Sequence, residues 1–214
     1  MTALPLRSAA GADLGTIAAD SSWFGIEPNM SVLHQVVTAQ LAARRSGTQS
    51  TKTRAEVART GRKSRRQKGG GTSRQGSMRS PSWIGGGVAL GPKPRKYLQR
   101  TPKKMVNLAL RSALSDRATD GHVLVVNEFT WTTPKTKDGV ASLKSLGVDG
   151  RVLFVCNPSS ESELIAAKAL RNLPEVQLID AGELNAYDVL LSDWVVFTRS
   201  TVPGAPDSAE GETK

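Results

Sequence analysis

The chain has 214 residues, a formal net charge of +10 and a sequence pI near 10.1, so it is long enough for one domain, or for one domain with an appendage. Its single cysteine excludes an intramolecular disulfide and fits a reducing compartment. Neither a signal peptide nor a membrane span is predicted, because the first fifteen residues lack the basic and apolar regions of a leader and the longest apolar runs have four or five residues. A chain this basic usually meets nucleic acid.

Two short strands are predicted near the start, around Leu4–Leu6 and Gly15–Ala18. A connection over Asp20–Met30 leads to a helix for which Ser31 is the predicted N-cap. The apolar face of this helix is predicted to contain Leu33, Val36, Val37 and Leu41. Two cations, which suit the negative end of the helix dipole, and a glycine are predicted to end the helix: Arg44, Arg45 and Gly47.

The next stretch concentrates the positive charge of the chain. Residues 44–104 hold eighteen of the 29 Lys and Arg and a single acid, Glu56, for a net charge of +17, whereas the remaining residues are net −7. The same stretch contains ten of the twenty glycines. From Gly47 to Ser82 the apolar side chains are only Ala55, Val57, Ala58 and Met78. So little apolar surface cannot offset the entropy of ordering the backbone, so we expect residues 46–100 to be extended or disordered alone and ordered against a polyanion.

The rest of the chain alternates between apolar runs and helical segments. A helix is predicted to resume with Thr101 as its cap and Pro102 at its first position. Its apolar face contains Val106, Ala109, Leu110, Ala113 and Leu114. The predicted strands are Val123–Asn127, Val152–Cys156, Val176–Asp180 and Trp194–Thr198. Between them lie the helical or turn-rich segments Thr133–Leu146, Ser160–Arg171 and Glu183–Leu191, and the spacing of Ser160 and Glu163 is that of a capping box.

Strands that alternate with helices predict an α/β fold, a Rossmann-like and mostly parallel sheet with flanking helices. The predicted organisation is a single globular α/β domain made of residues 1–45 and 101–202. Residues 46–100 form a long extended basic internal loop inserted in that domain, and residues 203–214 form a polar tail.

An α/β sheet invites an enzymatic interpretation, which the motifs do not support. The dinucleotide fingerprint fails at both glycine clusters, and the P-loop and Gly-x-Ser-x-Gly patterns are absent. One Cys and two His cannot supply a Cys/His metal set. Cys156 ends an apolar strand and is interpreted as a small buried hydrophobe, while His34 and His122 are interpreted as surface or packing residues. We therefore predict no catalytic residues, no metal and no cofactor.

The basic loop instead has the inventory of an RNA-binding segment. Lys and Arg supply contacts to phosphate, Gly lets the backbone approach the nucleic acid, and Ser, Thr and Gln add neutral hydrogen bonds. A run of charged residues is often only a solvated tail. This run is internal, lies between two predicted helices, and has a positive charge too large for an ordinary surface loop. The predicted RNA-binding residues are Lys52, Arg54, Arg59, Arg62, Lys63, Arg65, Arg66, Gln67, Lys68, Arg74, Arg79, Trp83, Lys93, Arg95, Lys96, Lys103 and Lys104.

Seven short strings in and around the loop form a recognisable pattern: His34–Val37, Thr51–Val57, Arg66–Gly69, Arg79–Pro81, Gly85–Val88, Pro92–Arg95 and Pro102–Met105. In this order they resemble the bacterial large-subunit ribosomal protein four family, most strongly over residues 31–118. The tip departs from the family pattern, in which a proline and an aromatic precede Arg66; this chain has Ser64 and Arg65 there.

The resemblance implies a structural constituent of the large ribosomal subunit, located in the cytoplasm on the ribosome and not at a membrane. It implies direct binding of large-subunit ribosomal RNA early in subunit assembly, contacts with neighbouring ribosomal proteins, and a loop tip that lines the exit tunnel next to the nascent peptide. The tunnel-lining residues implied are Arg65, Arg66, Gln67, Lys68, Gly69, Gly70, Gly71 and Thr72. The alternatives are an RNA-modifying or processing α/β enzyme with a basic substrate-holding insertion, and a regulator that binds messenger RNA.

Overall fold

The computed structural model describes residues 2–204, so the predicted polar tail lies outside the described residues from position 205 on. The chain divides into two compact units, which are described separately below. The first contains the residues up to Gln40 together with those from Arg100 on, and the second contains Leu41–Gln99.

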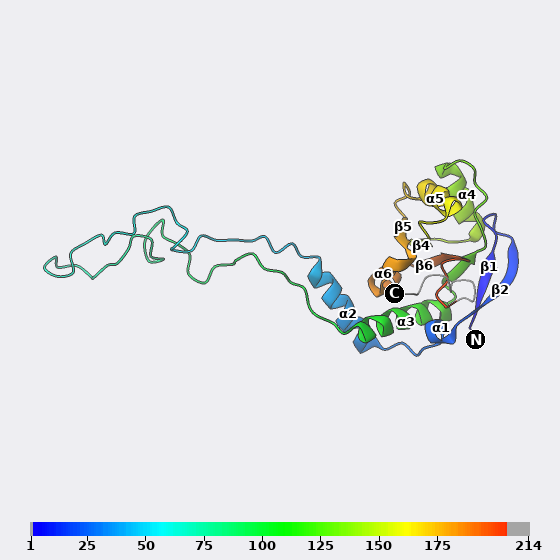
Figure 1. Ribbon diagram of the computed structural model, residues 1–214, viewed down its shortest axis with the longest axis horizontal. Helices are drawn as coiled ribbons and strands as arrows, with labels where there is room; N and C mark the ends of the chain where they lie inside the picture. The colour runs from blue at the N-terminus through cyan, green and yellow to red at the C-terminus, as the bar shows by residue number, and fades with distance from the viewer. Residues whose placement is uncertain (1, 205–214) are drawn as a thin grey trace. The chain divides into compact units, whose positions relative to one another are not determined.

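The first unit is built on a six-stranded sheet, ordered β2-β1-β3-β6-β4-β5. The strands are β1 Thr2–Arg7, β2 Asp13–Ala19, β3 Val123–Val126, β4 Val152–Cys156, β5 Val176–Asp180 and β6 Trp194–Thr198. Only the edge strand β2 is antiparallel to its neighbour; the other four pairings are parallel. The prediction of a mostly parallel α/β sheet is confirmed (Figure 1).

The helices cover both faces of this sheet. They are α1 Ser21–Phe24, α2 Met30–Ala43, α3 Lys103–Thr119, α4 Thr136–Leu146, α5 Glu161–Leu170 and α6 Ala186–Leu191, with a short 3-10 helix, η1 Ala181–Glu183. Successive strand residues point to opposite faces, so β4 sends Leu153 and Val155 into one core and Phe154 into the other. The first core packs against α1, α2, α3 and α6, and the second against α4 and α5.

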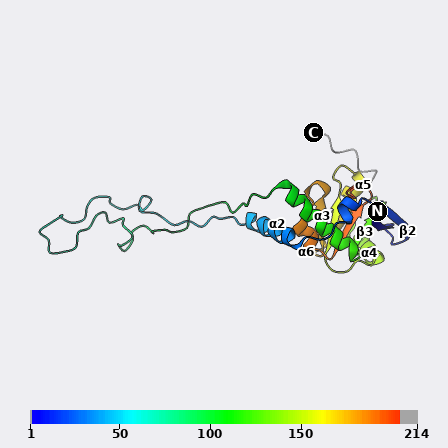
Figure 2. The same ribbon diagram turned by 90° about the horizontal axis from the view of Figure 1, so that it is seen from below.

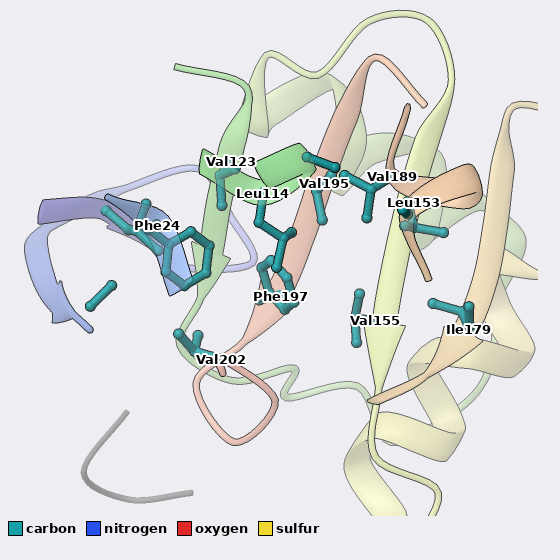
Figure 3. Packing of buried hydrophobic residues seen from close by; sticks show 14 of the residues in the cluster. Phe24, Leu114, Val123, Leu153, Val155, Ile179, Val189, Val195, Phe197 and Val202 are labelled. Atoms are coloured by element: carbon teal, nitrogen blue, oxygen red, sulfur yellow. The ribbon is translucent and has the colours of Figure 1, made fainter. Parts of the chain in front are cut away.

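The first core is centred on an aromatic pair. Phe197 of β6 is fully buried and meets Phe24 of α1 edge to face, with 6.2 Å between the ring centroids. Leu114 of α3 is also fully buried beside Phe197, as the close view in Figure 3 shows. Helix α1 lies within the segment predicted as a plain connection, and Asp20 caps it by accepting a hydrogen bond from the amide of Ser22.

The starts of the two long helices differ from the prediction. Ser31 lies inside α2, and the N-capping side chain is Asn29, which accepts from the amide of Val32 at 3.1 Å. Pro102, predicted as the first helical residue, is itself the N-cap of α3, so Thr101 lies one residue further out. Most residues of the two predicted apolar faces are buried or partly buried, whereas Val106 and Leu41 are exposed.

The predicted capping box at α5 is wrong. Ser160 occupies the N-cap position without a side-chain cap bond. The buried carboxylate of Glu163 accepts instead from the amide of Asn157 at 2.6 Å and from the hydroxyls of Thr198 and Ser200. This carboxylate connects α5 to the segment after β4 and to the end of β6 at the carboxyl edge of the sheet. Its three donors are why it is bound there and not at the start of its own helix.

Candidate nucleic-acid interface

The second unit is a hairpin of irregular chain that follows the last turn of α2. We call residues 46–63 the outgoing limb, residues 64–76 the tip and residues 77–99 the returning limb. The two limbs run side by side in both views (Figures 1 and 2), although neither forms a regular strand. A single isolated antiparallel bridge, between Lys63 and Ser77, marks the boundary of the tip.

Backbone hydrogen bonds connect the limbs at intervals. Nearest the ends of the unit, the amide of Arg95 donates to the carbonyl of Gly47 at 3.2 Å. The amide of Thr51 donates to Pro92 at 3.0 Å, and the amide of Val88 donates to Lys52 at 2.9 Å. These contacts are too sparse for a sheet, but they fix which residues of the two limbs are opposite each other.

Tyr97 gathers the cations at the beginning of the hairpin. The guanidinium groups of Arg45 and Arg95 lie 4.1 and 4.4 Å from its ring centroid, and the side-chain amide of Gln49 donates to its hydroxyl at 2.7 Å. A hydrogen bond from Arg95, together with the positive charge of both arginines, lowers the pKa of Tyr97 below its usual value. The ring thus contacts two like charges, one just after α2 and one on the returning limb.

Glu56, the single acid of the stretch, forms an ion pair across the limbs. One carboxylate oxygen accepts from the ammonium of Lys93 at 2.5 Å and from the backbone amide of Thr53 at 2.9 Å. The hydrogen bond from Lys93, followed by that from Thr53, lowers the pKa of Glu56 below its usual value. Among residues 2–204 this is the one Lys or Arg ion pair with a carboxylate that lies within 4.0 Å.

Two arginines predicted to bind RNA also bond within the hairpin. Arg59 donates to the carbonyl of Ile84 at 2.6 Å, and the Nε of Arg79 donates to the carbonyl of Arg59. Trp83 is half-buried, with its indole N–H donating to Gln75 at 3.2 Å and the guanidinium of Arg65 5.9 Å from its ring. These three residues, Arg59, Arg79 and Trp83, are therefore partly engaged by the protein itself.

The other predicted RNA-binding side chains are exposed. They are Lys52, Arg54, Arg62, Lys63, Arg65, Arg66, Gln67, Lys68, Arg74, Lys93, Arg95, Lys96, Lys103 and Lys104. Within the tip, the whole predicted tunnel-lining run 65–72 is exposed, and the φ angles of Gly69 and Gly71 are +80° and +60°. Such angles favour glycine, so the tip has a tightly turned backbone with no side chain at its turns.

The carboxyl edge of the parallel sheet is where an α/β enzyme would place its site. A cavity of about 290 Å³ there is lined by Asn127, Glu128, Phe129, Ser160, Ser162, Glu163, Thr198, Arg199 and Ser200. Its buried carboxylate, Glu163, accepts from three protein donors, so it connects the segments that follow β4 and β6. Within residues 2–204 no group of three His, Cys, Asp or Glu could hold a metal ion, and none of the described helices is long and apolar enough to cross a membrane.

Comparison with known proteins identifies the family. The sequence model of the ribosomal protein L4/L1 family matches residues 17–204. The chain belongs to the ribosomal protein L4/L1 family. It is 49% identical over 194 residues to the large ribosomal subunit protein uL4 of Mycolicibacterium smegmatis, covering 90% of this chain and 89% of the relative. It is 49% identical over 196 residues to uL4 of Mycobacterium tuberculosis (strain CDC 1551 / Oshkosh), covering 91% and 86% respectively.

Membership of the ribosomal protein L4/L1 family makes the chain a structural protein of the large ribosomal subunit in the cytoplasmic translation machinery, and it confirms the resemblance noted from short motifs. Proteins of this family are ribosomal and generally not enzymes. The matched residues 17–204 include the entire basic hairpin.

Sequence reasoning missed two members of the hairpin's contact set. The sequence identifies Glu56 only as the exception to the positive charge, and Tyr97 is not among the predicted RNA-binding residues. The sequence did contain a signal for Glu56. A single carboxylate among eighteen Lys and Arg is attracted by many cations, so an ion pair with one of them could have been expected. No comparable signal pointed to Tyr97, because its cations come from both ends of the hairpin.

Proposed function

We propose that this L4-family chain binds large-subunit ribosomal RNA directly through its basic hairpin. The observation that carries the proposal is the exposure of fourteen of the seventeen predicted RNA-binding side chains. Glu56, the single acid in the same stretch, is already paired to Lys93. Exposed Lys and Arg on an extended chain neutralise phosphates, and the glycines allow close approach of the backbone. The organisation proposed is the globular part, residues 1–45 and 101–202, carrying the inserted loop 46–100.

We infer that the chain joins the subunit early in assembly. The hairpin has few buried apolar side chains and sparse hydrogen bonds, so it offers RNA a charged surface instead of a rigid folded one. An extended segment of this kind is best buried when RNA helices pack around it. The protein must therefore be bound before the surrounding RNA has folded. The large hydrophobic side chains Ile84, Leu90 and Leu98 are exposed in the hairpin and support further contacts with RNA or neighbouring ribosomal proteins.

We propose that the tip, with residues 65–72, lines the exit tunnel and meets the nascent peptide. The run is exposed throughout and combines Arg65, Arg66 and Lys68 with three successive glycines, which suits a segment that contacts RNA on one side and leaves space on the other. The family resemblance motivates the assignment to the tunnel.

A photo-crosslinking amino acid at Lys68, compared with one at the exposed Arg171 of the globular unit, tests both proposals in ribosomes stalled with a labelled nascent chain. We expect Lys68 to crosslink to ribosomal RNA and to the nascent chain, and Arg171 not to reach the nascent chain. RNA crosslinks without nascent-chain crosslinks at Lys68 would refute the tunnel assignment. Absence of RNA crosslinks from Lys68 and from a second probe at Lys52 would refute RNA binding by the hairpin.

A further inference from the structure

Glu56 has an unusual place for an acid in a segment that should bind a polyanion. It lies among cations on the outgoing limb, yet its carboxylate faces Lys93 of the returning limb at 2.5 Å. The same oxygen accepts from the amide of Thr53, and the amides of Glu56 and Val57 both donate back to the Thr53 carbonyl, so the acid is held in a local turn. Both its partners are therefore protein groups on the two limbs.

Several glycines in the limbs occupy positions where the opposite limb comes very close. A Cβ on Gly47 would lie 2.1 Å from the carbonyl oxygen of Arg95, and one on Gly91 would lie 2.1 Å from the hydroxyl oxygen of Thr51. A Cβ on Gly87 would lie 2.3 Å from the backbone nitrogen of Arg54. Side chains at these positions would push the limbs apart, because real Cβ contacts are never this short.

The glycines at and beside the tip are different. A Cβ on Gly61, Gly69, Gly71 or Gly76 would meet nothing within 4 Å, and one on Gly70 would meet only the hydroxyl of Thr72 at 3.8 Å. Three hairpin glycines, Gly47, Gly87 and Gly91, thus allow limb-to-limb contact, whereas the five at and beside the tip leave the backbone open to other molecules.

We propose that Glu56, Lys93 and the close-contact glycines Gly47, Gly87 and Gly91 form a clasp that sets the register of the two limbs, and that Glu56 is a positioning residue for RNA binding and not an RNA contact. The proposal rests on the proposed function, because it concerns how the hairpin presents its cations to RNA. The cross-limb contacts place Lys52 opposite Val88, Arg54 opposite Gly87 and Arg95 opposite Gly47. The clasp therefore fixes the relative positions of the cations that the two limbs present to phosphate.

The physical need for a clasp follows from the charge of the limbs. Two strongly cationic segments at hydrogen-bonding distance repel one another, and apolar packing between them is sparse. One carboxylate between the limbs reduces that repulsion and raises the fraction of molecules in which the cations are in register. Binding then requires less ordering, and the apparent dissociation constant, which is inversely proportional to that fraction, falls.

Glu56→Gln gives a test in which two explanations predict opposite signs. The amide keeps the shape and can still accept from Thr53, but it removes the negative charge. If Glu56 only faced the RNA, losing its charge would tighten binding of the full-length chain to a transcript of the large-subunit ribosomal RNA. The clasp predicts that binding weakens, by up to about fivefold, because the ion pair is between exposed side chains. Glu175→Gln, the same charge change at an exposed site of the globular unit, serves as control and should not weaken binding.

Exchanging the charges of Glu56 and Lys93 tests whether the ion pair itself matters, and not only the presence of either side chain. The double variant Glu56→Lys with Lys93→Glu restores a cross-limb ion pair at unchanged net charge, so it should recover most of the affinity lost by Glu56→Lys alone. Equal affinities of the single and double variants would overturn the clasp.

Glycine variants give a second test that does not depend on charge. Gly87→Ala forces a methyl group against Arg54 and should weaken binding, whereas Gly76→Ala meets nothing in the protein and should leave affinity nearly unchanged. Equal losses at the two positions would contradict the clasp.

The outcomes also separate this inference from the function on which it rests. A wild-type chain that does not bind the transcript at all would contradict the proposed RNA-binding function. A wild-type chain that binds, with a Glu56→Gln variant that binds as tightly or more tightly, would contradict the clasp alone.

Discussion

The effect of a single substitution in the first core on the free energy of unfolding depends on how deeply the side chain is buried. Phe197 is fully buried against Phe24, so Phe197→Ala should lower the free energy of unfolding by about 3–5 kcal/mol, through lost transfer energy and the cavity left behind. Val106 was predicted from helical spacing to face the same core but is 37% exposed. Val106→Ala should therefore cost less than about 1 kcal/mol. Urea unfolding followed by circular dichroism compares the two; equal losses would contradict this assignment of the core.

Cys156 provides a prediction about pH. Burial, and next the nearby charges of Asp180 and Glu163, raise the pKa of this thiol to about 11. The unfolded chain ionises the thiol first, so the thiol's contribution should reduce stability as pH rises from the ordinary thiol value towards 11. The free energy of unfolding of the wild type should thus fall more between pH 8 and pH 11 than that of Cys156→Ala. Parallel falls in the two proteins would show that the buried thiol does not resist ionisation.

For single residues, the sequence predicts well which side chains are buried, but not which hydrogen-bond partners they have. Cys156 was expected to be a small buried hydrophobe and is buried, because it ends an apolar strand run. The capping role expected for Glu163 was wrong, because Thr198 and Ser200, 35 and 37 residues away, compete successfully for its carboxylate. Long-range competition of this kind leaves no local signal in the chain.

Secondary-structure elements were predictable where burial is strong. The runs Val152–Cys156, Val176–Asp180 and Trp194–Thr198 are strands with the predicted bounds, because short runs rich in apolar residues between turn-rich segments fit few other structures. Helix starts were less predictable, since Asn29 and Ser31 both suit the N-cap. Asn29 occupies it, and its backbone amide also donates to the hydroxyl of Ser112 in α3 at 3.4 Å, a contact with no local signal in the sequence. The short helix α1 was missed because four residues carry no periodicity.

Helix ends offer a matched prediction. Gly147 terminates α4 in the left-handed region with φ of +70°, and its amide donates to the carbonyls of Leu143 and Lys144. Gly147→Ala should lower the free energy of unfolding by about 1 kcal/mol through backbone strain alone, because a Cβ there meets nothing within 4 Å. Gly182→Ala, at an equally open position without a positive φ, should be neutral or slightly stabilising. Thermal unfolding measures both, and similar effects at the two glycines would rule out strain as the cause.

For the whole molecule, the uneven charge distribution dominates. Residues 44–104 carry a net charge of +17 and the rest −7, so the hairpin and the globular unit have opposite preferences for a polyanion. Composition was sufficient to locate the candidate interface and to exclude a packed core there. Composition could not reveal that the limbs contact each other. Those contacts are made by backbone groups, by glycines and by one acid, and none of these is distinguished by composition alone.

The sedimentation of a tagged copy of the chain in a cell lysate washed with high salt is the most direct test of its place in the large subunit. Purely peripheral phosphate contacts weaken steeply with salt, whereas a hairpin enclosed by RNA helices stays in place until the subunit itself unfolds. We predict that the chain remains with the large subunit after the wash. Its release to the top of the gradient, with subunits intact, would contradict integration of the hairpin into the ribosomal RNA.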